Sequence, residues 1–62
     1  MLDVIALAPG ARLRIAGGLL AEVIANLGDG EWVRVRLLEP DGTPPAPTRE
    51  ELCHAADILD LL

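Results

Sequence analysis

The chain has 62 residues and a mass of 6.6 kDa, which is enough for one small domain with a limited core. Hydrophobic residues make up 52% and charged residues 24%, a balance typical of a folded chain and not of a disordered one. Ten acidic residues against five arginines give a net charge of −5, which argues against non-specific binding to nucleic acid or to an anionic membrane. A single cysteine excludes an internal disulfide, and the lack of a long apolar run or basic leader leads us to expect a cytoplasmic protein.

Glycine and proline divide the chain into short segments, at residues 2–7, 11–16, 19–27, 31–39 and 51–62. Four of these segments are shorter than a typical α-helix of about 11 residues, and their spacing predicts the strands of a small sandwich or barrel. Residues 40–48 are rich in proline, and we expect an extended loop there.

Two segments alternate between apolar and polar side chains, which predicts half-buried strands. The expected inward set is Leu13, Ile15, Val33, Val35 and Leu37, and the expected outward set is Arg12, Arg14, Trp32, Arg34 and Arg36. Alternation in residues 19–27 is weaker, because both of its faces are partly apolar.

The first hairpin is predicted from a three-residue loop, Ala16-Gly17-Gly18, between two of these strands. This loop places Leu13 opposite Ala21 and Arg12 opposite Glu22. A slip of one residue would move arginines into the core, so the register is strongly selected.

The second hairpin is predicted from the loop Gly28-Asp29-Gly30, with glycine in the left-handed position. On the inner face this register pairs Ala25 with Val33, Val23 with Val35 and Ala21 with Leu37. On the outer face it pairs Ile24 with Arg34 and Glu22 with Arg36. Together the two hairpins predict a row across three strands, made of Arg12, Glu22 and Arg36.

The last segment has two interpretations. Thr48-Arg49-Glu50-Glu51 fits a capping box, and a helix would place Leu52, Ala55, Ala56, Leu59 and Leu62 on one face. The other interpretation is a short strand, a turn at Ala56-Asp57 and a closing strand Ile58–Leu62. Periodicity does not distinguish them, and either would cover the apolar face of a three-stranded meander.

Several stretches resemble the SH3-like small β-barrel superfamily, and its KOW-type and bacterial variants most closely. They are Pro9-Gly10-Ala11-Arg12-Leu13-Arg14-Ile15, Gly17-Gly18, Ala21-Glu22-Val23 and Gly30-Glu31-Trp32-Val33-Arg34-Val35, and Ala56-Asp57-Ile58-Leu59 is similar to the turn and strand that close such barrels. The resemblance implies an all-β fold with one SH3-like barrel domain over residues 1–62, built on a meander at 11–39. It favours the closing strand, and a meander covered by a C-terminal helix is the alternative.

The expected outer face carries the candidate partner-binding residues, which are Arg12, Arg14, Trp32, Arg34 and Arg36. Tryptophan and arginine are enriched at binding hot spots. We therefore expect a non-catalytic protein-interaction module or small accessory protein, whose partner is another protein or a second copy of the chain. The alternative is a nucleic-acid-binding barrel of the KOW type, in which Trp32 is a stacking platform.

Catalytic chemistry finds little support in the sequence. Cys53 and His54 are the only thiol and imidazole, and adjacent residues on a strand point to opposite faces. We expect Cys53 in the core and His54 at the surface, with the carboxylates solvated at turns. The sequence therefore predicts no enzyme, no catalytic residue, no metal site and no cofactor.

Overall fold

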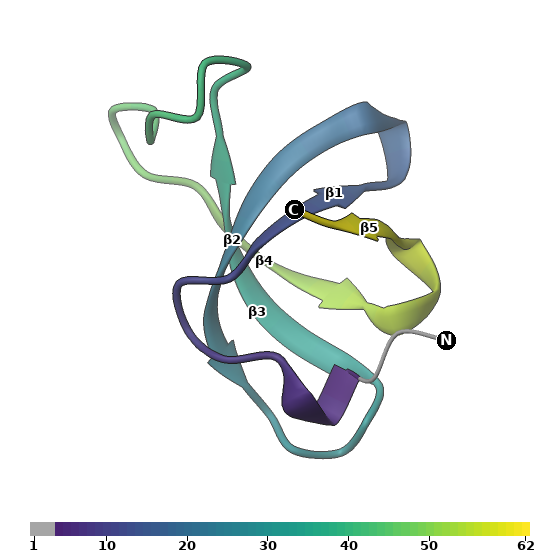
Figure 1. The fold of residues 1–62 in the computed structure, drawn as a ribbon. Helices are drawn as coiled ribbons and strands as arrows, with labels where there is room; N and C mark the ends of the chain where they lie inside the picture. Colours follow the sequence, from purple (N-terminus) through teal and green to yellow (C-terminus); the bar gives the residue numbers. More distant parts are fainter. Residues whose placement is uncertain (1–3) are drawn as a thin grey trace.

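The computed structural model describes residues 4–62 and shows a five-stranded antiparallel sheet that curls around one core (Figure 1). The strand order is β4-β3-β2-β1-β5. The strands are β1 (Arg12–Ile15), β2 (Leu19–Asn26), β3 (Trp32–Leu38), β4 (Glu50–His54) and β5 (Ile58–Leu61), and the short 3₁₀ turns are η1 (Val4–Ala6), η2 (Ala16–Gly18) and η3 (Ala55–Asp57). The expected all-β fold, built on a three-stranded meander, is confirmed.

The core lies on the inner face of the sheet, where the alternation of β1 and β3 placed it. Leu13, Val33 and Val35 are fully buried, and Val23 is 1% exposed. Burying a valine or leucine side chain contributes roughly 1.5–3 kcal/mol. Because the arginines of β1 and β3 alternate with these residues, burial of the core fixes the arginines on the outer face.

The first hairpin has the predicted register. Arg12 pairs with Glu22 and Leu13 with Ala21, and η2 is the expected three-residue loop. Gly17 has a φ of +86° and Gly18 a φ of +77°, a backbone conformation that side chains with a Cβ rarely adopt. The two glycines therefore determine both the length of the loop and the register of the strands.

The second hairpin has the predicted register only in the part that is distant from its loop. The pairs Ala21–Leu37, Glu22–Arg36 and Val23–Val35 are confirmed.

Between Val23 and Ala25 the register of this hairpin shifts, so that Ala25 pairs with Arg34 and Asn26 with Val33. The expected pairs Ala25–Val33 and Ile24–Arg34 are wrong, because Ile24 is an extra residue in a β-bulge. The loop spans residues 27–31 and is longer than expected.

The contacts of Asn26 give a physical reason for the bulge. Its side-chain amide donates to the carbonyl oxygens of Val4 and Leu7, at 2.6 and 3.0 Å, and so ties η1 to the end of the core. Its own oxygen accepts from the N–H of Gly28 at 2.9 Å. An inward Asn26 requires one more residue in β2 than a regular ladder provides.

The C-terminal segment consists of β4, η3 and β5, so the interpretation as a helix is wrong. A helix would satisfy its own backbone, whereas here β4 hydrogen-bonds to β3 and β5 to β1. The turn is stabilised at His54, whose Nδ1 accepts from the N–H of Ala56 at 3.0 Å.

The first segment does not form the expected strand. Residues 4–6 form η1, and the first residue of the segment, Leu2, lies outside the described residues. Val4 and Leu7 are both buried, and a spacing of three residues brings two side chains to one side of a 3₁₀ turn but not of a strand. No helix within residues 4–62 is long and apolar enough to cross a membrane.

Candidate functional site

The predicted binding residues all lie on the outer face, but β2 separates them into two groups. Arg12 and Arg14 belong to β1, whereas Trp32, Arg34 and Arg36 belong to β3. Four of them are exposed, and Arg36 is half-buried. The five side chains therefore share one face without forming one continuous patch.

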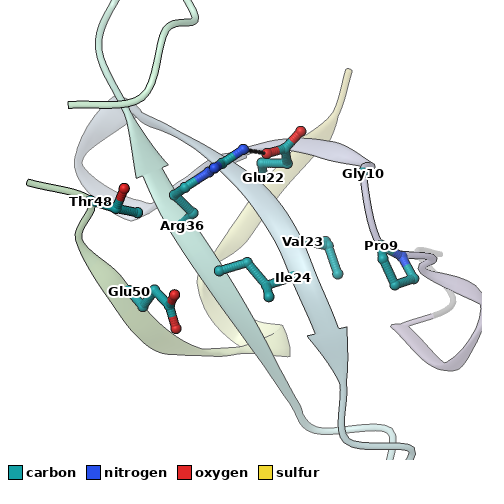
Figure 2. Close-up of a pocket in the computed structure, with 8 residues that line it drawn as sticks. All are labelled: Pro9, Gly10, Glu22, Val23, Ile24, Arg36, Thr48 and Glu50. Atoms are coloured by element: carbon teal, nitrogen blue, oxygen red, sulfur yellow. Dashed lines mark hydrogen bonds and ion pairs between the residues drawn. The ribbon is translucent and has the colours of Figure 1, made fainter. Parts of the chain in front are cut away.

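A row of alternating charge crosses the outer face. The register places Arg12 beside Glu22, Glu22 beside Arg36, and Arg36 beside Glu50, so the row spans four strands. The guanidinium of Arg36 forms an ion pair with Glu22 (Figure 2). The predicted row of Arg12, Glu22 and Arg36 is thus confirmed, and its charges largely compensate one another.

A pocket of about 410 Å³ lies over this row, between Pro9 and Gly10 on one side and Thr48 on the other (Figure 2). Its charged lining consists of Glu22, Arg36 and Glu50. Two carboxylates against one guanidinium give the pocket a negative balance, so it is a poor site for an anion.

Arg36 is a structural residue more than a free binding group. Its side chain is 34% exposed, and its Nε atom is buried with no hydrogen-bond partner among the described residues. The ion pair with Glu22 holds the guanidinium against the sheet, and the Nε atom is covered there without a compensating hydrogen bond.

The two arginines of β1 lie against loops of the fold and, like Arg34, form no ion pair within residues 4–62. Arg14 donates to the carbonyl oxygen of Gly18 at 2.9 Å and lies opposite Asp60 of β5. The guanidinium of Arg12 lies against Gly42 of the β3–β4 loop, where an added Cβ would be 2.9 Å from it. Arg14 therefore supports the loop of the first hairpin, whereas Arg12 lies beside Gly42 without an ion pair or hydrogen bond from its side chain to any residue in 4–62.

Trp32 and Arg34 differ from the other candidates. Arg34 lies between Ala25 and Leu52, and it forms no ion pair with any residue in 4–62. The Trp32 side chain is 38% exposed, and its ring meets His54 edge-on with centroids 4.8 Å apart. Leu52 is 55% exposed. This end of the outer face therefore combines an uncommitted arginine with accessible apolar surface.

Sequence reasoning missed Leu52 and His54 as neighbours of Trp32 and Arg34. They pair through the register of β4 on β3, in which Trp32 faces His54 and Arg34 faces Leu52. The only available signal was the alternation of Leu52 and His54 with Cys53, and it was obscured by the competing interpretation as a helix.

Cys53 and His54 do not form a catalytic pair. The Cys53 side chain is in the core and 5% exposed, and burial together with the nearby charges of Asp57 and Glu51 raises the pKa of its thiol. The imidazole Nδ1 of His54 accepts a backbone hydrogen bond from Ala56. A buried thiol with a raised pKa is a weak nucleophile. Within the described part of the chain, no three His, Cys, Asp or Glu side chains group to hold a metal ion.

Comparison with protein-family models, curated proteins and solved structures gives no match to this chain. The geometry of the outer face is therefore the basis for the function proposed below.

Proposed function

We propose that this chain is a small non-catalytic interaction protein, which binds another protein through the outer face of its sheet. The site is centred on Trp32 and Arg34; Arg36 lies on the same strand, and Arg12 and Arg14 lie on the same face across β2. The observation that carries the proposal is that Arg34 has no ion-pair partner within residues 4–62 and lies on the same face as a tryptophan that is 38% exposed.

The chemistry of this site favours a protein partner with an apolar group beside a carboxylate. Trp32 offers a flat apolar surface, and the guanidinium of Arg34 binds a carboxylate with two parallel hydrogen bonds. Leu52 extends the apolar surface on the neighbouring strand. Tryptophan and arginine are among the residues enriched at binding hot spots.

We further propose that the domain, residues 1–62, is a member of the SH3-like small-barrel superfamily. The strand order β4-β3-β2-β1-β5 and the 3₁₀ turn before β5 support this assignment. The fold alone does not specify a function, since this architecture hosts many unrelated ones.

The test is capture of partners from an extract of the source cells by the immobilised chain. Arg34→Glu should remove the captured protein, because it replaces the uncommitted guanidinium with a carboxylate. Arg49→Glu is the matched control, since Arg49 carries the same charge on a side chain that is 68% exposed and lies next to β4. Equal capture by the wild-type chain and a folded Arg34→Glu variant would contradict the proposal.

The second candidate function is binding of single-stranded nucleic acid, and the exposure of Trp32 beside Arg34 is the observation that favours it. Stacking of a base on an aromatic ring contributes about 1–3 kcal/mol. The acidic side chains between the arginines and the net charge of −5 oppose it. A single-stranded RNA titration at low salt that leaves Trp32 fluorescence unchanged would exclude this candidate.

A further inference from the structure

Strand β4 forms one edge of the sheet, and one side of its backbone pairs with no other strand among residues 4–62. Leu37 N–H donates to the carbonyl of Arg49 at 2.8 Å, and Ala55 N–H donates to the carbonyl of Glu31 at 2.7 Å. Hydrogen-bonding residues alternate along an antiparallel strand, so the odd-numbered residues of β4 face β3. The backbone groups of Glu50 and Leu52 and the N–H of His54 consequently point away from β3, toward the open edge, whereas the His54 carbonyl accepts from the Cys53 thiol and begins η3.

This edge is short and carries two glutamates, which discourage pairing with another chain, but it lacks the other protective features. β4 contains no proline or lysine, and its five pairs with β3 run without a bulge. Its one inward-facing charge, Glu51, lies 3.8 Å from Arg49 and is partly compensated. Leu52, at the middle of the strand, is 55% exposed. Regular edges of this kind are templates for another strand.

We propose that β4 pairs antiparallel with β4 of a second copy of this chain, with Leu52 opposite Leu52 about a two-fold axis. In this register Glu50 of each copy lies opposite His54 of the other. The Leu52 pair exchanges two backbone hydrogen bonds. Each Glu50–His54 pair adds the bond from the N–H of His54 to the carbonyl of Glu50, since the His54 carbonyl already accepts from the Cys53 thiol and begins η3. The interface is isologous, as in most dimers.

The side chains of the facing residues are complementary in this register. Nδ1 of His54 accepts the N–H of Ala56 at 3.0 Å, so the proton of the neutral ring is on Nε2. Nε2–H is then the donor for the carboxylate of Glu50 in the second copy, which does not require a charged imidazole. At the centre, two Leu52 side chains meet between the aliphatic stems of Arg34 from each copy.

A second copy fits this edge better than an unrelated strand, because the segment Glu50–His54 is complementary to itself when two copies run antiparallel. Pairing extends the sheet sideways and leaves the outer face open except at the edge, where each Leu52 meets Leu52 of the other copy. The inference therefore does not depend on the proposed function, and it places two Trp32–Arg34 sites on one side of a continuous sheet. The net charge of −5 on each copy opposes association, so added salt should strengthen the dimer.

The first test is sedimentation equilibrium over about 10 μM to 1 mM, the range for a weak small interface. We expect the mass to rise toward twice 6.6 kDa. Leu52→Lys should raise the dissociation constant by about tenfold or more, because it buries two like charges at the axis. Leu59→Lys is the matched control, since Leu59 is 60% exposed on the opposite edge strand, β5.

Three results would overturn the proposal. The first is a monomer throughout this range. The second is the formation of oligomers larger than a dimer that disappear in the Leu59→Lys variant. That result would indicate head-to-tail pairing of β4 of one copy with β5 of the next.

The third concerns backbone hydrogen exchange of the wild-type chain. The amides of Leu52 and His54 should gain protection with protein concentration, whereas those of Glu51 and Cys53 should stay protected at every concentration. A dimer without this pattern would have its interface elsewhere.

Discussion

Replacement of Asn26 tests the contact between η1 and the sheet. The amide of Asn26 donates to the carbonyls of Val4 and Leu7, at 2.6 and 3.0 Å, and its oxygen accepts from the N–H of Gly28 at 2.9 Å. A hydrogen bond contributes about 1 kcal/mol net, so Asn26→Ala should lower the free energy of unfolding by about 2–3 kcal/mol. A domain of this size has roughly 3–9 kcal/mol in total.

Asn26→Asp tests the loss of the hydrogen-bond donor without a loss of side-chain volume, because the carboxylate has nearly the same size as the amide and no N–H to donate. At neutral pH it also places negative charge against two carbonyl oxygens. We expect it to destabilise the domain at least as much as Asn26→Ala. Urea unfolding followed by Trp32 fluorescence measures both changes. If Asn26→Asp costs less than about 0.5 kcal/mol, the assigned role of this side chain is wrong.

The remaining predictions concern the core, the β2–β3 loop and the thiol. Val35 is fully buried, so Val35→Ala should cost about 1–3 kcal/mol, and a melting temperature unchanged within a degree would contradict its place in the core. Hydrogen bonds from the N–H groups of Trp32 and Glu31 lower the pKa of Asp29 below the ordinary value of 3.8. The ionised carboxylate therefore stabilises the fold fully above pH 3.8, and this contribution is lost as pH falls through the lower folded-state pKa. Asp29→Asn should remove this part of the pH dependence of stability in an acid titration. Burial raises the pKa of Cys53, so its reaction with a thiol reagent should be much slower than that of a free cysteine and should accelerate on unfolding; a fast reaction in the folded chain would show that the thiol is accessible.

The first hairpin was predictable because its determinants are local. Gly17 and Gly18 supply the positive φ angles of the loop, and the alternation of Arg12 with Leu13 excludes every register that buries an arginine. Turn chemistry and facial alternation agree there, and agreement between local signals makes a register predictable.

The second hairpin was predicted incorrectly near its loop because a distant contact decides its register. Asn26 bonds to Val4 and Leu7, some twenty residues earlier in the chain, and alternation within β2 contains no trace of that contact. Asp29 adds to the difference, since its carboxylate accepts from the N–H groups of Glu31 and Trp32 and supports a wider loop.

The sequence predicted which residues lie on the outer face, but not which of them contact one another. Alternation put every arginine of β1 and β3 outside, but the division between committed and free side chains depends on cross-strand partners. Arg36 meets Glu22 and Glu50, whereas Arg34 meets Ala25 and Leu52. Ala25 and Leu52 lie beside Arg34 because β2 has a bulge and β4 pairs with β3, and the sequence pattern determined neither feature.

Mapping a bound partner on the sheet tests the central claim most directly. The captured protein is titrated into the ¹⁵N-labelled chain, and the change in each amide and indole signal is recorded. We predict the largest changes at the indole N–H of Trp32 and at the amides of residues 32–36, with smaller ones at β1. Largest changes on β5 or in the loop 39–49, with Trp32 unaffected, would contradict the account of the outer face as the binding surface.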